Sequence, residues 1–189
     1  MQFSPILRTE RLILRLPAVE DAAAVGDFYR RNWTHLEPWW PRMDTRSFDV
    51  EPRRIAIQHA LKEFQTGTAV RFIITLKTAP NRMVGLANVN HIVAGVSQSG
   101  ILGYGLDHLL EGQGIMKEAL TAVIAYCFNE LNLHRLEAHY VPQNERSGAV
   151  LKSLNFMPHG YARDYLLING RWQDHILTYL VNPNWKSTP

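Results

Sequence analysis

The chain has 189 residues, with 20 lysines and arginines against 17 acidic residues, so its formal net charge is +3. This length predicts one domain over residues 1–189, large enough to fold without a disulfide or a structural metal. The composition, 46% hydrophobic and 20% charged, excludes a disordered chain. No apolar run approaches the roughly 18 residues of a membrane-spanning helix, and the first residues lack a signal-peptide pattern. A cytoplasmic protein without a membrane partner is therefore expected.

The cysteine and histidine residues indicate neither a disulfide nor a metal site. Cys127 is the single cysteine. It lies on the apolar side of a predicted helix with no adjacent base, so we interpret it as a core residue. The eight histidines show no metal-ligand spacing, and no His-Glu-x-x-His motif occurs. The small positive charge does not indicate direct reading of a nucleic acid, although it allows an acidic or RNA-rich neighbour.

Hydrophobic periodicity divides the chain into strands of period two and helices of period 3.6. In chain order the pattern predicts a strand over 12–16, helices over 19–31 and 52–65, strands over 70–76, 83–92 and 100–107, a helix over 115–131, a strand over 134–141, a helix over 145–154, and a hairpin of 161–168 with 171–180. Residues 32–41, rich in tryptophan and proline, fit neither period. Ala79-Pro80-Asn81 is predicted as a turn, and Asn169-Gly170 is a strong hairpin signal.

The connections between these elements predict an α+β fold. The three strands over 70–107 are joined by connections too short for crossovers, so they should form an antiparallel meander. The helix over 115–131 is long enough to cross over a sheet. The strands on either side of it should therefore be a parallel pair inside a mixed, mostly antiparallel sheet.

A glycine-rich segment, residues 111–116, lies between a predicted strand and the long helix. Gly112 and Gly114 let the backbone approach a ligand closely, and the first N–H groups of the helix can receive an anion. A dinucleotide fingerprint would need a third glycine where Lys117 stands, and a P-loop would need Gly-Lys-Ser/Thr. A pyrophosphate cradle remains, with an ordinary glycine turn as the alternative.

A second segment begins at Asn144 and continues into a short helix. Asn144 precedes that helix and is suited to cap it. Ser147 lies one turn inside, where a serine hydroxyl ordinarily faces solvent or bonds back to the chain.

The two segments together resemble known sequence motifs. Residues 111–120, Glu-Gly-Gln-Gly-Ile-Met-Lys-Glu-Ala-Leu, resemble the acetyl-CoA signature of the Gcn5-related N-acetyltransferases (GNAT). Asn144-x-x-Ser147, with residues 154–160, is similar to a later motif of that family. Residues 9–15, 36–39 and 160–175 resemble its Rim branch, whose members act on ribosomal proteins. The resemblance extends from about residue 8 to residue 185.

This resemblance implies the GNAT acyltransferase fold, a seven-stranded sheet with helices on both faces. The parallel strands 100–107 and 134–141 would splay apart into a V. Acetyl-CoA would be the co-substrate, with its pantetheine arm on the first of these strands and its pyrophosphate on the glycine-rich segment. The implied cofactor-binding residues are Leu106, Asp107, His108, Gly112, Gln113, Gly114, Ile115, Met116, Lys117, Asn144 and Ser147. Glu111 stands where glutamine or arginine is usual, and its charge should weaken phosphate binding slightly.

Three residues are candidates for catalysis. Ser147 would lie near the sulfur and donate to the departing thiolate. It would take this role because Leu151 stands where many members have a tyrosine that acts as the general acid. Glu137 is the first candidate for the general base and Asp164 the second. An α-amino group has a pKa near 7.7–8.0, so a useful fraction is already neutral near pH 7.5. The base therefore need only accept a proton, directly or through water. For both carboxylates an ordinary salt bridge is the alternative. Asn155, which ends the short helix, is expected in a left-handed conformation.

The acceptor is less well defined. Trp33, Trp39 and Trp40 either line an acceptor groove or form a packing cluster. The resemblance implies direct transfer, in a ternary complex, to a protein N-terminal amine, the alanine of ribosomal protein S5, and allows association with the ribosome. The alternatives are another protein N-terminus, a polyamine or antibiotic amine, and a non-catalytic ribosome-associated CoA-binding protein. The oligomeric state stays open.

Overall fold

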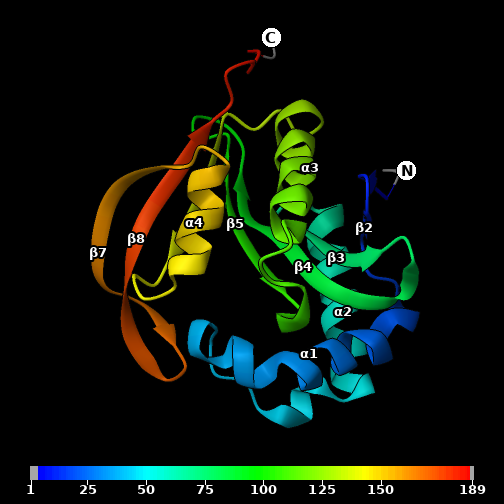
Figure 1. Cartoon of the computed structure of the whole chain (residues 1–189). Helices are drawn as coiled ribbons and strands as arrows, with labels where there is room; N and C mark the ends of the chain where they lie inside the picture. The colour runs from blue at the N-terminus through cyan, green and yellow to red at the C-terminus, as the bar shows by residue number, and fades with distance from the viewer. Residues whose placement is uncertain (1–3, 188–189) are drawn as a thin grey trace.

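The computed structural model describes residues 4–187, which form one twisted open sheet with helices on both faces (Figure 1). In chain order the elements are β1 (Ile6–Arg8), β2 (Leu12–Arg15), α1 (Ala22–Leu36), α2 (Val50–Gln65), β3 (Val70–Leu76), β4 (Ala79–Val93), β5 (Ser99–Leu106), α3 (Ile115–Asn129), β6 (Arg135–Tyr140), α4 (Glu145–Ser153), β7 (Met157–Ile168) and β8 (Arg171–Val181), with short 3-10 turns between them. The predicted order of helices and strands is confirmed.

The sheet order is β1-β2-β3-β4-β5-β6-β8-β7, and β5–β6 is its parallel pair. The mixed, mostly antiparallel sheet is therefore confirmed, but it has eight strands rather than the seven expected. The additional strand is β1, which pairs with β2 through Leu7 opposite Leu14. A strand of three residues is too short for its alternation to be recognised in the sequence.

The parallel pair separates soon after it begins, which confirms the predicted V. Ser99–Ile101 pairs with Arg135–Glu137, yet β5 continues to Leu106 and β6 to Tyr140. Backbone N–H and C=O groups along the separated stretches lose their partner across the gap, and these groups need another one. The separation thus leaves room for a ligand in the middle of the sheet.

The core lies on both faces of the sheet. On the face covered by α3 and α4, Leu120 and Cys127 pack against strand residues such as Leu136, all fully buried. Burial raises the pKa of the Cys127 thiol to about 12, which keeps it protonated and confirms its interpretation as a core residue. On the other face, Phe28 of α1 and Leu86 of β4 belong to a second cluster.

The first helix is longer than predicted. α1 continues to Leu36, so residues 32–36, expected to be irregular, are helical. Asn32 is fully buried, and its Nδ2 donates to the carbonyl oxygen of Phe28, one turn earlier, at 2.9 Å. The helix ends just before Pro38, which stands in a 3-10 turn.

Two strand boundaries also differ from the predictions. Leu76 pairs with Ala79, so the turn falls at residues 77–78, and Ala79-Pro80-Asn81 belongs to β4. β7 begins at Met157 rather than at residue 161. No helix among residues 4–187 has both the length and the apolar character needed to cross a membrane.

Candidate active site

A cavity of about 420 Å³ lies beside the separated end of β5. Its walls come from the end of α1 and the turn after it, from β5, from the loop before α3, and from α4. The predicted site residues that line it are Trp39, Trp40, Leu106, Gly112, Gly114, Ile115, Met116, Lys117, Asn144 and Ser147. Segments far apart in the sequence therefore meet at one hollow.

The loop before α3 is shaped to receive an anion. Gly112 and Gly114 have φ angles of 71° and 74°, in the left-handed region that favours glycine. Gly114 is the N-cap of α3, so the N–H groups of Ile115 and the next residues have no acceptor within the helix. The positive end of the helix dipole lies at the same place. This cradle fits a pyrophosphate. A Cβ added at Gly112 would meet nothing within 4 Å, so the φ angle and not the available space favours glycine there.

Arg11 braces the cradle from the first hairpin of the sheet. Its Nε donates to Glu118 Oε2 at 2.6 Å, and its Nη1 donates to the Gln113 carbonyl oxygen at 2.9 Å. Both partners flank the start of α3. Arg11 therefore fixes the orientation of the N–H groups that the cradle presents, a role that no local pattern around residue 11 could indicate.

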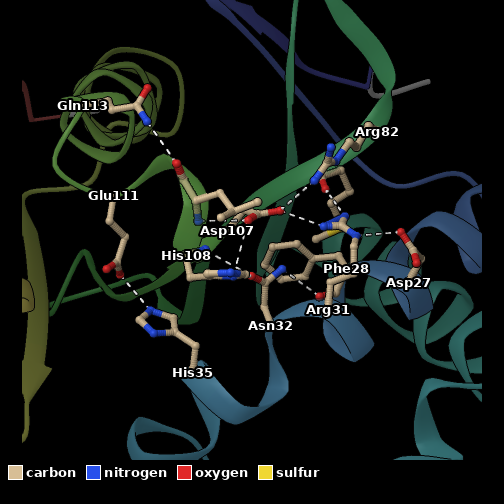
Figure 2. A network of polar contacts seen from close by, with 12 residues as sticks. Asp27, Phe28, Arg31, Asn32, His35, Arg82, Asp107, His108, Glu111 and Gln113 are labelled. Atoms are coloured by element: carbon tan, nitrogen blue, oxygen red, sulfur yellow. Dashed lines mark hydrogen bonds and ion pairs between the residues drawn. The ribbon is translucent and has the colours of Figure 1, made fainter.

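Glu111 links the cradle to helices on both faces of the sheet. One carboxylate oxygen lies 2.8 Å from Nε2 of His35 on α1, a contact drawn in Figure 2. The other oxygen accepts from Arg146 of α4. The carboxylate is thus neutralised by a guanidinium, which explains how a negative residue stands beside a phosphate cradle.

Asp107 is the buried centre of an ion cluster at the end of β5 (Figure 2). Its side chain is 1% exposed, and Oδ2 accepts from Arg31 Nη1 at 2.7 Å, with Arg82 at 3.4 Å. Burial opposes ionisation, but the backbone N–H of Leu109 and the Arg31 guanidinium outweigh it and lower the pKa of Asp107. The carboxylate therefore holds α1 and β4 to the end of β5.

The neighbouring side chains also hold the loop in place rather than line the cavity. Asn32 Oδ1 accepts from the backbone N–H of His108 at 3.1 Å and lies 2.8 Å from its Nδ1. Gln113 Nε2 donates to the Leu109 carbonyl oxygen at 3.0 Å. The implied cofactor contacts of Asp107, His108 and Gln113 therefore stay predictions. Their side chains are used within the protein, and the backbone N–H groups of Asp107 and His108 donate to the Val84 carbonyl oxygen and to Asn32.

At the start of α4, Asn144 and Ser147 both face the cavity. Asn144 Oδ1 accepts from the Ser147 N–H at 3.2 Å, so its capping role is confirmed. Ser147 Oγ lies 2.8 Å from the hydroxyl of Tyr104 on β5. Tyr104, which also lines the cavity, was missed because its alternation on the strand looks like that of any core residue. Leu151 is buried in the core, and Asn155 has the predicted left-handed φ, 64°.

Neither candidate base lines the cavity. Glu137 lies opposite Ile101, at the last pair before β5 and β6 separate, and its Oε1 accepts from Arg135 at 2.8 Å. Asp164 is exposed, with a φ of 46°, at an irregular stretch of β7. Its backbone N–H donates to Asp174 Oδ1 at 2.9 Å. Both carboxylates thus show features of their ordinary alternative, and their catalytic roles stay predictions.

The tryptophans do not separate cleanly into groove and packing residues, because Trp40 also packs edge-on against Tyr29, with ring centroids 5.8 Å apart. Their contact with an acceptor stays a prediction. Trp33 packs edge-on against Phe48, with ring centroids 5.2 Å apart, so it belongs to a packing cluster. Trp39 and Trp40 line the cavity. The Trp40 ring lies directly over Gly105 of β5, where an added Cβ would come within 2.9 Å of Cζ2. Only glycine at that position allows the indole to form this wall.

Comparison with known proteins agrees with the geometry of this cavity. Residues 11–157 match the family model described as the acetyltransferase (GNAT) domain. The chain belongs to the GNAT family. This GNAT protein is 37% identical over 179 residues to the [ribosomal protein uS5]-alanine N-acetyltransferase of Escherichia coli (strain K12), a match that covers 95% of this chain and 92% of that protein.

Solved structures agree with this GNAT assignment. A ribosomal-protein-S5-alanine acetyltransferase from Vibrio fischeri superposes with a TM-score of 0.91 and 33% identity, covering 97% of this chain and all of the other. Mycobacterium smegmatis RimJ, in complex with CoA-disulfide, gives a TM-score of 0.88 at 29% identity, over 98% and 90% of the two chains. The protein is an N-acetyltransferase, and its acyl donor is acetyl-CoA.

Proposed function

We propose that this enzyme transfers the acetyl group of acetyl-CoA directly to a protein N-terminal amine, the alanine of ribosomal protein S5. One observation carries the proposal. The anion cradle, the Ser147 hydroxyl and two tryptophans all face one cavity, so donor and acceptor can meet there. The acceptor is supported by the E. coli relative, which carries that activity in its name and matches 95% of this chain. Action in the cytoplasm, in contact with ribosomal components, is part of the proposal.

The residues of the cavity have distinct roles in this proposal. The backbone N–H groups of Gly112–Lys117 hold the pyrophosphate, and Asn144 orients the pantetheine arm. Ser147 donates a hydrogen bond to the departing sulfur. A backbone N–H of the separated part of β5 holds the oxygen that becomes negative during transfer. An α-amino group is partly neutral near pH 7.5, so Glu137, or in second place Asp164, need only drain its proton through water.

Trp40 is proposed as a wall of the acceptor groove. Its backbone oxygen accepts from the N–H of Asn169, at the tip of the β7–β8 hairpin, at 2.9 Å. Trp40→Ala is expected to raise the KM for the acceptor peptide by about tenfold, because it removes a large apolar contact. The KM for acetyl-CoA should stay within about twofold. Steady-state kinetics check this, with Trp172→Ala, on the exposed face of β8, as the control. Equal changes in both KM values would contradict the proposal.

Mass spectrometry tests the acceptor directly. The enzyme is incubated with acetyl-CoA and, separately, with an S5 N-terminal peptide, peptides starting with other residues, spermidine and an aminoglycoside. Acetylation of the alanine peptide at its α-amine, ahead of the small amines, supports the proposal. Faster acetylation of another N-terminus or of a small amine would replace the acceptor. Binding of CoA without an acetylated product on any acceptor would favour the non-catalytic binding protein.

A further inference from the structure

We propose that Tyr104 is the positioning residue for Ser147: its hydroxyl donates to Ser147 Oγ and thereby directs the serine O–H into the cavity, toward the departing sulfur. The inference rests on the proposed role of Ser147. It assigns a function to a tyrosine of the strand, in a chain whose α4 has Leu151 rather than a polar residue facing the core.

The geometry shows a close contact between two hydroxyl groups at the cavity wall. Tyr104 stands on β5, on the face covered by α3 and α4, and Ser147 lies in the first turn of α4. The two oxygens are 2.8 Å apart, a normal O–H···O distance, and the tyrosine oxygen also lies 3.2 Å from the Ser147 carbonyl oxygen. Both residues line the cavity.

The hydroxyl groups can be arranged in two ways. A hydroxyl has one proton and two acceptor positions. In the first arrangement Ser147 donates to Tyr104, Tyr104 donates to the Ser147 carbonyl, and no proton points into the cavity. In the second, Tyr104 donates to Ser147 Oγ and the serine proton is released toward the cavity. The two interchange by rotation of two O–H bonds, and negative charge on a nearby sulfur favours the second.

Acidities decide whether Tyr104 gives up its proton. Burial raises the pKa of Tyr104 to about 12, whereas a thiol ionises near pH 8.5. Transfer of the phenolic proton to a thiolate would therefore be unfavourable by roughly three to four powers of ten. During transfer the amine forms its bond to the acetyl carbon and the C–S bond breaks. The electron pair goes to sulfur, and the amine proton goes to water. Tyr104 keeps its proton and acts only through its hydrogen bond.

Tyr140 provides a matched control on the opposite limb of the V. It packs against Gly148, next to Ser147, so closely that an added Cβ would come within 2.8–2.9 Å of two ring carbons and 3.0 Å of the hydroxyl oxygen. Within the described part of the chain, the tyrosine hydroxyl that bonds to Ser147 is that of Tyr104, and the Tyr140 hydroxyl makes no such bond. Loss of its hydroxyl therefore tests what a tyrosine-to-phenylalanine change beside α4 does by itself.

The experiment is a double-mutant cycle on acetylation of the S5 peptide. Tyr104→Phe is expected to lower kcat about tenfold, with both KM values within about twofold, and Tyr140→Phe to leave kcat unchanged. Ser147→Ala should lower kcat by at least as much as Tyr104→Phe. In the Ser147→Ala background, Tyr104→Phe should then cost less than twofold, because the two hydroxyls act as one unit.

Three outcomes would overturn the inference: an unchanged kcat in Tyr104→Phe, an equal loss in Tyr140→Phe, or a full tenfold loss retained in the Ser147→Ala background. If the wild-type enzyme is active and Tyr104→Phe leaves kcat unchanged, this inference alone fails and the proposed function stands. If no amine is acetylated, the proposed function fails, and the same cycle is read on the slow hydrolysis of bound acetyl-CoA, where the same departing sulfur needs the same donor.

Discussion

Asp107→Ala is expected to lower the free energy of unfolding by about 3 kcal/mol, because it removes a buried carboxylate and the charge-assisted hydrogen bonds that it accepts. The carboxylate is 1% exposed and lies between Arg31 and Arg82. Without it Arg31 keeps only its exposed carboxylate partner Asp27, Arg82 loses its carboxylate partner, and α1 would lose a direct attachment to β5. Chemical denaturation followed by tryptophan fluorescence measures the loss.

Asp27 is the matched control for this prediction, because it pairs with the same arginine from the surface. Its Oδ2 lies 2.9 Å from Arg31 Nε, but its side chain is 58% exposed. Exposed pairs one helical turn apart contribute only a few tenths of a kcal/mol. Asp27→Ala should therefore change the unfolding free energy far less than Asp107→Ala. Equal losses would show that Arg31, and not burial of Asp107, determines the strength of the cluster.

The pH dependence gives a second check on Asp107. Its folded pKa is lowered, so its contribution to stability is fully present above its unfolded pKa, near 3.9, and is lost as the pH falls through the folded value. The difference in unfolding free energy between wild type and Asp107→Asn should accordingly be constant near neutral pH and narrow below about pH 3.9. A difference that grew on acidification would contradict the assignment.

Signals carried by neighbouring residues were sufficient to predict most of the fold. The crossover helix between β5 and β6 follows from its length, and the left-handed conformation at Asn155 follows from residue type. These features depend on interactions within a few residues along the chain. They were therefore visible without the structure, and so was the glycine-rich segment before α3.

The contacts that complete the site could not be predicted, because they join residues distant in sequence. Asn32 looks like a loop residue in the sequence, but its side-chain oxygen contacts His108, 76 positions later, inside the protein. Glu111 reaches His35 across the same separation, and Tyr104 finds Ser147 43 residues away. Periodicity describes which face a residue occupies, but it does not specify which partner stands across that face.

The anion cradle before α3 is expected to have a large effect on CoA binding. Gly114→Val is expected to weaken CoA binding at least tenfold, because valine in a left-handed conformation costs of order 1–3 kcal/mol and the loop would rearrange. An added Cβ would meet Arg11 Nη2 at 3.6 Å, an ordinary contact, so the effect comes from the backbone and not from a collision.

Gly67→Val is the control, because it imposes the same backbone strain away from the cavity. Gly67 has a φ of 71° after α2, and an added Cβ there would meet nothing within 4 Å. Both variants should lose similar thermal stability, while only Gly114→Val should lose affinity for CoA in isothermal titration calorimetry. Equal affinities in the two variants would mean that the N–H groups after Gly114 do not hold the pyrophosphate. Since those groups are aimed by Gly114 and by the Arg11 brace, weaker binding in Gly114→Val alone would identify the backbone at the start of α3 as the element that holds the acetyl donor.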